Sequence, residues 1–355
     1  MKVAFISLFY LNISFSGGSL YAYHLAHSLN KKVDLTVFIP NINSKKLDKE
    51  INYVTVDIKK KPIVKTFSFM SNIKRSINID DFDIIHVNEI GGLFLDRIDA
   101  LTFHHTPDTI IKRFHNIPTY FEAKKSSVIL TVSNNSKIQI KKIKSFKKKR
   151  IEVLPNGINP IFLKKEDVKK VEKIREKYKL ENKKVVLYIN SNFTERKNLP
   201  LMIKTAKYLK KKLPEFRLIM LINSKYNREC KKLLIKHKID DITILLSNQT
   251  DEELFNLYHL CDLLAMPSTR EGFGFPLIES IAAGKPFISF NVGIALELTE
   301  AGFGFIAKNS DDFIEKCLKN VENPIFYTNS KSYVRENYSW KFSSEKLIQV
   351  YDNLI

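Results

Sequence analysis

The chain has 355 residues, of which 44% are hydrophobic, and it carries a formal net charge of +20. At roughly 150 residues per domain this length predicts two domains, and the apolar content excludes wholesale disorder. The three widely spaced cysteines form neither a disulfide framework nor a metal-ligand pattern, so we expect a reducing compartment.

The first element is an apolar run at residues 3–11. Continuous apolar runs are typical of buried parallel strands, whereas a signal peptide is the alternative interpretation. The run is short, only Lys2 flanks it on the N-terminal side, and no A-x-A cleavage pattern follows it. We therefore predict a strand. No later segment reaches about 18 consecutive apolar residues, so no membrane-spanning helix is expected.

Apolar, β-rich runs then alternate with amphipathic stretches along the whole chain. The first series of strands is predicted at residues 3–9, 35–39, 84–87, 101–103, 128–132 and 151–154, with helices at 20–29 and 136–143. A second series is predicted at 185–189, 218–222, 242–246, 263–266 and 287–290. Alternation of this kind indicates βαβ units, so we predict an α/β protein with two doubly wound, Rossmann-like domains.

Helix starts in the second series are well marked. Asn198 is a candidate N-cap with Pro200 in the first turn, and Thr250 with Glu253 forms a capping box before a helix of about ten residues. Pro276 predicts a further helix start, and a charged helix is expected at 166–180. In open α/β sheets ligands bind beyond the carboxyl ends of the strands, so the loops after strands are where chemistry is expected.

The loop at 267–274 follows a predicted strand and carries the strongest chemical signal. Glu271 lies in the loop and is followed by Gly272 and Gly274, which permit close backbone approach to a ligand, and Glu279 falls in the first turn of the helix opened by Pro276. A helix N-terminus suits a diphosphate, and a carboxylate can accept hydrogen bonds from neighbouring sugar hydroxyls. A purely structural first-turn acid is the alternative for Glu279.

This stretch closely resembles the E-x7-E motif of retaining GT-B glycosyltransferases of family four. The matching residues are Glu271, Gly272, Phe273, Gly274, Phe275, Pro276, Leu277, Ile278 and Glu279, followed by 283–286 as A-G-K-P. The resemblance implies that Glu271 contacts hydroxyls of the donor sugar. It implies that Glu279 holds the ribose hydroxyls of the nucleotide.

Other segments match the family in chain order. Gly17 and Gly18 resemble its glycine-rich loop near the phosphates and acceptor, and His104 resembles the histidine that approaches the donor sugar, although His105 is adjacent. Residues 154–158 resemble the interdomain hinge, with Asn159 where aspartate is usual.

The phosphate-binding lysine of the family corresponds to Lys197. The family's Gly-Arg pair several residues earlier is replaced here by Ser191 and Asn192, and Arg196 is the candidate for the missing cation, with a solvent-facing role as its alternative. Ser339-Trp340 and the helix after them resemble the family's C-terminal helix that returns to the first domain. The predicted division is 1–158 on the acceptor side, 159–335 for the nucleotide sugar, and 336–355 for that helix.

The resemblance implies a GT-B fold whose two domains face a cleft. It also implies retaining transfer of a hexose, of mannose or glucose type, from a GDP- or UDP-sugar to a glycan or lipid-linked acceptor in envelope or glycoconjugate synthesis. No metal or other cofactor is expected. The rivals are a GT-B enzyme of different chemistry, such as a phosphorylase, and a basic module that binds nucleic acid or membrane.

The positive charge leaves several partners open. Lysines are dense at 59–61, 141–150 and 204–212, and the last group fits a solvated helix face. Nucleic acid is disfavoured because the dense runs lack interleaved aromatics. A lysine-rich composition bias would explain the charge without any partner. Attachment to an anionic membrane is the narrower hypothesis, with the protein cytoplasmic and peripheral on the inner face of the cytoplasmic membrane.

Overall fold

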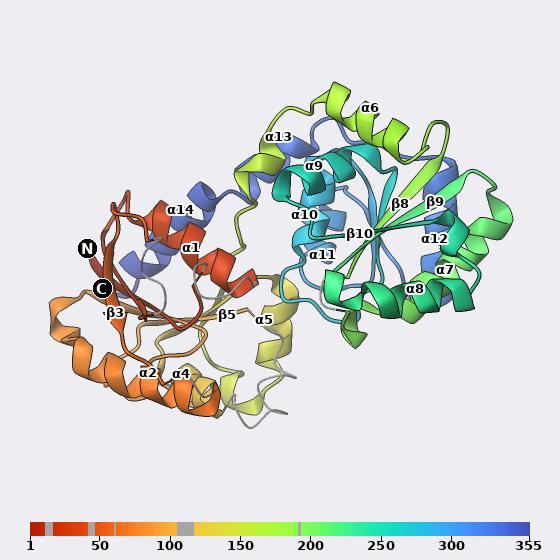
Figure 1. Cartoon of the computed structure of the whole chain (residues 1–355). Helices are drawn as coiled ribbons and strands as arrows, with labels where there is room; N and C mark the ends of the chain where they lie inside the picture. The colour runs from red at the N-terminus through yellow and green to blue at the C-terminus, as the bar shows by residue number, and fades with distance from the viewer. Residues whose placement is uncertain (11–16, 42–46, 60–61, 105–116, 191–192) are drawn as a thin grey trace. The chain divides into compact units, whose positions relative to one another are not determined.

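The fold is taken from a computed structural model, which describes residues 1–10, 17–41, 47–59, 62–104, 117–190 and 193–355. The chain divides into two compact units. The first unit comprises Met1–Gly157 and Tyr338–Ile355, and the second comprises Ile158–Asn337. Each unit has a parallel sheet with helices on both faces (Figure 1).

The sheet of the first unit has the strand order β3-β2-β1-β4-β5-β6-β7, and the pairings along it are parallel. Its strands are β1 (Lys2–Ser7), β2 (Asp34–Pro40), β3 (Asn52–Val56), β4 (Ile84–Asn88), β5 (Ala100–Phe103), β6 (Val128–Thr131) and β7 (Ile151–Val153). Val3 pairs with Leu35 on one side and with Ile84 on the other. The N-terminal apolar run is therefore a buried inner strand, as predicted.

Helices cover both faces of this sheet. They are α1 (Gly17–Leu29), α2 (Pro62–Ser76), α4 (Ile117–Lys125), α5 (Asn134–Lys141) and α14 (Trp340–Asp352), with 3-10 turns η2 (Ile79–Asp81) and η4 (Lys144–Phe146). One apolar cluster joins α1 and α14 to the sheet, and another joins α2, α4 and α5 to its other face. The sheet is thus buried on both sides, which explains why its inner strands are apolar without alternation.

The C-terminal helix α14 packs within the first unit. Ser28 of α1 donates hydrogen bonds to the Trp340 carbonyl at 3.0 Å and to Ser344 Oγ at 2.8 Å. Ser343 Oγ donates to the Pro155 carbonyl at 2.7 Å. A Cβ at Gly157 would lie 2.5 Å from the Trp340 ring, so only glycine fits there.

The second unit repeats the architecture with the strand order β10-β9-β8-β11-β12-β13. Its strands are β8 (Lys184–Asn190), β9 (Phe216–Ile222), β10 (Thr243–Ser247), β11 (Leu263–Met266), β12 (Phe287–Ser289) and β13 (Phe305–Ile306). Its helices are α6 (Val168–Lys177), α7 (Leu199–Lys212), α8 (Asn227–Lys236), α9 (Asp251–Leu260), α10 (Phe275–Ala282), α11 (Ala295–Glu300), α12 (Ser310–Glu322) and α13 (Ser330–Asn337). The 3-10 turns are η5 (Pro160–Leu163), η6 (Glu195–Lys197), η7 (Ser224–Tyr226) and η8 (Asp240–Ile242).

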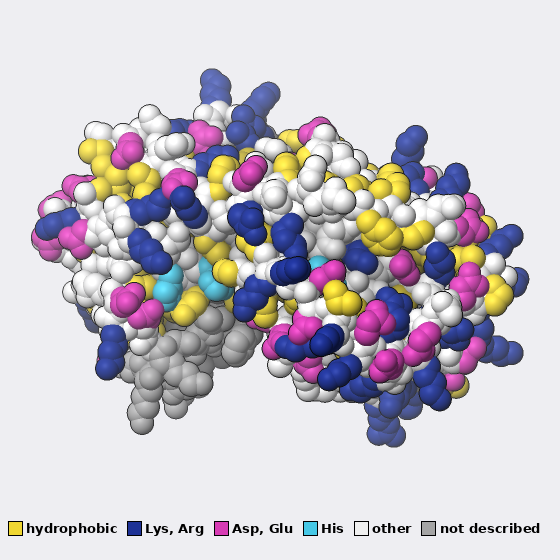
Figure 2. Space-filling view, turned by 90° about the horizontal axis from the view of Figure 1, so that it is seen from above, with side chains coloured by type: hydrophobic (Ala, Val, Ile, Leu, Met, Phe, Trp, Pro, Cys, Tyr) yellow, Lys and Arg dark blue, Asp and Glu magenta, His cyan; other side chains and the backbone are white. Residues whose placement is uncertain are grey.

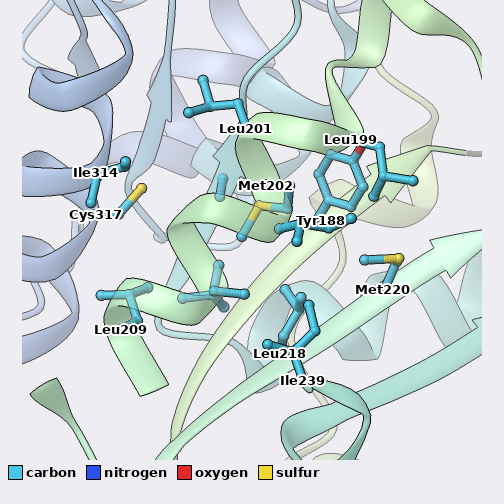
Figure 3. Close-up of a cluster of buried hydrophobic side chains, with 14 of the residues drawn as sticks. Tyr188, Leu199, Leu201, Met202, Leu209, Leu218, Met220, Ile239, Ile314 and Cys317 are labelled. Carbon is cyan, nitrogen blue, oxygen red and sulfur yellow. The ribbon is translucent and has the colours of Figure 1, made fainter. Parts of the chain in front are cut away.

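The core of the second unit fixes the start of α7 against β8. Tyr188 of β8 lies beside Leu199 and Met202 of α7 in a cluster of buried side chains (Figure 3). Cys317 of α12 belongs to the same cluster, and none of the three cysteines forms a disulfide. The loop between β8 and α7 is therefore held at both ends by packed residues.

The predicted α/β class and eleven predicted strands are confirmed, with ends shifted by a few residues. The predictions missed the edge strands β3 and β13, which are short and only partly buried. The helix expected at 20–29 begins earlier, so Gly17 and Gly18 lie in its first turn and not before it. The capping box of Thr250 and Glu253 is present at the start of α9.

Candidate active site

The predicted donor residues of the second unit lie together at the point where the strand order of its sheet reverses. Strands β8 and β11 are neighbours, yet the chain proceeds outward from them in opposite directions. Lys197 follows β8 and Glu271 follows β11. Ligands of doubly wound sheets bind at the carboxyl ends of such a strand pair, so the topology supports a site here.

Glu271 is bound by two cations from the loop after β8. Lys197 Nζ donates to Glu271 Oε1 at 2.6 Å, and Arg196 Nη1 donates to Glu271 Oε2 at 2.6 Å. The exposed fraction is 9% for the Glu271 side chain, 11% for Lys197 and 37% for Arg196. This is a mostly buried cluster with one more cation than anion, and it can accept a further negative group.

Burial alone would raise the pKa of Glu271. The ammonium of Lys197 and the guanidinium of Arg196 outweigh burial, and the pKa lies below its usual value. Glu271 is therefore a carboxylate at neutral pH, and it acts as a hydrogen-bond acceptor.

The backbone around Lys197 is held by side chains of β8. Tyr188 Oη donates to the Lys197 carbonyl at 3.0 Å, and Asn190 Nδ2 donates to Tyr188 Oη at 3.0 Å. Asn198 adopts a left-handed conformation with φ of 52° and caps α7, which turns the chain sharply after Lys197. These contacts fix the backbone at Lys197, and the bond to Glu271 orients its ammonium.

The start of α10 is built by a glycine and a proline. Gly274 is the N-cap with φ of 92°, a conformation that glycine adopts without strain, and Pro276 lies in the first turn. The first-turn N–H groups of such a helix attract anions. The ring of Phe273 is buried and meets that of Phe275 edge-on at 5.1 Å between centroids.

Glu279 lies one turn into α10 and is partly buried. Tyr258 Oη of α9 donates to Glu279 Oε2 at 2.7 Å. The pKa of Glu279 is raised to about 7, mainly by burial and also by Asp251, although Tyr258 and Lys197 act to lower it. A carboxyl with so high a pKa costs folding stability at neutral pH, which favours a functional over a purely structural role.

A cavity of about 670 Å³ borders the cluster. It is lined by Asn190, Phe193, Thr194, Glu195, Arg196, Asn198, Leu199, Pro200, Glu229, Thr269 and Arg270. This volume is in the range of small-molecule sites. Lys197, Glu271 and Glu279 are not among its lining residues, so the cavity and the ion cluster are neighbours that share Arg196.

The acceptor-side candidates of the first unit also meet. His104 Nε2 donates to Asn88 Oδ1 at 2.7 Å, because Asn88 Nδ2 is oriented by its own bond to Ser7 Oγ at 3.0 Å. A Cβ at Gly18 would lie 3.4 Å from His104 Cδ2 and 3.5 Å from Glu89 Oε2. The backbone of α1 therefore approaches both side chains closely.

Glu89 is a site residue that the sequence did not predict. It follows β4 directly and has φ of 66°, which is unfavourable for a residue with a side chain. The available signal was its position: Glu89 is a charged residue directly after the apolar strand β4, which lies where the strand order reverses. His105, Ser191 and Asn192, named in the sequence analysis, lie outside the described residues.

Asn159, which the family resemblance places beside a hinge and where it expects aspartate, contacts α9. Its side-chain oxygen accepts from Ile161 N at 3.1 Å, and its Nδ2 donates to Asp251 Oδ2 at 2.8 Å. The amide supplies a donor that aspartate lacks. Within the described ranges, no group of three or more His, Cys, Asp or Glu side chains could hold a metal ion.

Two family models match the chain, one on each unit. Glycosyltransferase Family 4 matches residues 15–161, and Glycosyl transferases group 1 matches residues 170–337. The chain belongs to the GT-B glycosyltransferases of the family-four type. This glycosyltransferase is 25% identical to an uncharacterized glycosyltransferase of Methanocaldococcus jannaschii, with 100% of the chain and 99% of that protein covered.

Solved structures show the same fold. The glycosyltransferase superposes on sucrose-phosphate synthase from Thermosynechococcus elongatus with a TM-score of 0.81 at 15% identity, covering 100% of this chain and 99% of that one. Anabaena HepE in complex with UDP-glucose gives a TM-score of 0.76 at 17% identity, covering 99% and 100%. The predicted GT-B fold is confirmed.

Proposed function

We propose that this glycosyltransferase moves a hexose from a UDP- or GDP-sugar to a glycan or lipid-linked acceptor, with retention of anomeric configuration. The proposal rests mainly on one observation. Lys197 and Arg196 follow β8, and the N-terminus of α10 follows the neighbouring strand β11, at the point where the strand order reverses. The two side chains are cations and the helix N-terminus carries a partial positive charge. Positive charge stabilises a diphosphate as it departs. The UDP-glucose complex of HepE supports a nucleotide-sugar donor.

In this proposal each residue has a distinct role. Lys197 and Arg196 neutralise the diphosphate as it departs, together with the first-turn N–H groups of α10. Glu271 accepts from hydroxyls of the donor sugar, and Glu279 accepts from the ribose hydroxyls. The backbone at 272–275 approaches the donor, with Gly272 and Gly274 giving room for it.

The first unit contributes the acceptor side. His104 approaches the transferred sugar, and Gly17 and Gly18 border the phosphates and the acceptor. The acceptor hydroxyl attacks on the face from which the phosphate leaves, and the phosphate takes its proton. We expect transfer without an added metal, because the protein itself supplies the positive charge.

Nucleotide binding is the first test of this function. UDP, GDP and their sugars are screened by thermal shift, where a ligand at 100 times its Kd adds about 2.7 kcal/mol of stability. We expect a selective rise in Tm with one of the two bases. A folded sample whose Tm changes with none of these nucleotides would contradict the proposal.

We further propose that the first unit attaches to anionic membrane from the cytoplasmic side, where a lipid-linked acceptor in envelope polysaccharide synthesis would lie. The basic segment, residues 141–150, carries exposed lysines and packs beside α4, where Tyr120 Oη and Ser145 Oγ are 2.6 Å apart. Phe121 of α4 is 53% exposed. No helix in the described ranges could cross a membrane.

Vesicle sedimentation tests the membrane proposal. We expect pelleting with anionic vesicles and not with neutral ones, since each basic residue near the surface contributes roughly 1 kcal/mol. Lys147→Glu with Lys148→Glu should abolish it, whereas the same change at Lys211 and Lys212 of α7 should have little effect. Figure 2 shows Lys and Arg over both units. An equal loss of vesicle binding from both pairs of substitutions would therefore indicate unspecific charge attraction and refute a dedicated membrane surface.

A further inference from the structure

Tyr258 is a buried phenol behind the proposed ribose carboxylate. Its side chain has no exposed surface, and its hydroxyl donates to Glu279 Oε2 at 2.7 Å. The two residues belong to different helices, α9 and α10. The bond therefore ties the carboxylate to a second element of the fold.

The tyrosine ring is itself held in place. The ring of Phe162 meets it edge-on at 5.9 Å between centroids. The capping box of Thr250 and Glu253 fixes the start of α9, and Asn159 binds Asp251 in its first turn. With its ring packed, the phenol has little freedom to leave Glu279.

The bond from Tyr258 influences whether Glu279 is protonated, together with burial and the charges around it. The pKa of Glu279 is raised to about 7, and burial is the largest cause of this rise. Asp251 of α9 also contributes to the rise, whereas the Tyr258 hydroxyl and Lys197 of η6 act to lower the pKa. The hydroxyl donor therefore favours the carboxylate form, which accepts hydrogen bonds from two hydroxyls more strongly than the acid does.

We propose that Tyr258 is a positioning residue for donor binding, whose hydroxyl holds the Glu279 carboxylate in the orientation and charge state that meets the ribose hydroxyls. This inference rests on the donor site proposed above. It adds a residue from α9, outside the E-x7-E segment. Tyr258 acts through Glu279 and does not itself contact the nucleotide.

The test compares Tyr258→Phe, Glu279→Gln and the double variant with the wild type by calorimetric binding of UDP and of GDP. We expect Tyr258→Phe to weaken binding roughly five- to tenfold near neutral pH, because the carboxylate loses its fixed donor. The pH dependence of its nucleotide affinity should also shift to higher pH, since the pKa of Glu279 rises without that bond. The loss should therefore shrink toward about pH 9.

The double variant separates positioning from packing. If Tyr258 acts through Glu279, the double variant binds no more weakly than Glu279→Gln alone. Tyr351→Phe is the matched control, because Tyr351 is equally buried and bonds one side chain, His86, at 2.5 Å in the first unit. Its affinity and pH profile should equal those of the wild type.

Each contrary outcome has one meaning. Wild-type affinity and pH profile in Tyr258→Phe, or additive losses in the double variant, would overturn the role of Tyr258 while leaving the donor site intact. Wild-type affinity in Glu279→Gln would overturn the ribose role itself. Binding of neither UDP nor GDP by the wild type would refute the donor site, and the proposal for Tyr258 with it.

Discussion

Lys197→Ala is expected to lower the rate of sugar transfer by about 10²- to 10³-fold while the protein stays folded. The Lys197 backbone is held by Tyr188, and Lys197 Nζ is oriented by Glu271 Oε1 at 2.6 Å. Its loss removes a preorganised cation from the departing diphosphate. The measurement is steady-state transfer with the preferred nucleotide sugar, with folding verified by circular dichroism.

A purely structural role for Lys197 predicts a different result. In that case Lys197→Ala would lower Tm through the loss of the Glu271 ion pair and leave the rate per folded molecule unchanged. Lys204→Ala is the matched control, because Lys204 also pairs with an acid, Asp311, at 2.9 Å, but is 62% exposed. Its rate should equal that of the wild type.

Glu279→Gln is expected to weaken donor binding and to stabilise the unliganded protein above neutral pH. The pKa of Glu279 is raised from 4.5 to about 7 in the folded state. The folded state therefore binds more protons than the unfolded state between these values, and wild-type stability falls as pH rises through this window. Glutamine keeps an acceptor for Tyr258 without the buried charge.

The expected gain is on the order of 1 to 3 kcal/mol of unfolding free energy at pH 8. Below pH 4.5 the two proteins should converge, because Glu279 is then protonated in both states. Nucleotide affinity at pH 8 should fall roughly tenfold. Urea unfolding at several pH values measures the first effect, and equal stability of the two proteins at pH 8 would refute the burial argument.

The fold could be predicted largely from sequence because its signals are local. The capping box of α9 needs only Thr250 and Glu253, and buried strands such as β8 are recognisable as apolar runs. The edge strand β3 was missed because its N-Y-V-T-V sequence is short and its burial is partial. An edge strand of this kind forms because its backbone pairs with a neighbouring strand, here β2, and its own sequence pattern does not predict it.

The candidate site was predicted only where a motif names its residues. Glu271 and Glu279 are separated by a fixed spacing in one loop and helix, so their proximity follows from the chain. The bond from Arg196 to Glu271 joins residues 75 apart, and Tyr258 reaches Glu279 from another helix. Such contacts depend on which strands and helices are neighbours, and that is decided by the sheet order.

Sugar transfer by the wild-type protein tests directly whether this chain is a retaining glycosyltransferase, and it is also the reference for both substitutions above. Purified protein is incubated with the nucleotide sugar that raises its Tm and with candidate acceptors, in EDTA, and the products are followed by proton NMR. We expect release of the nucleoside diphosphate and a product with the donor's anomeric configuration. An inverted product, or a strict requirement for a divalent metal, would contradict it.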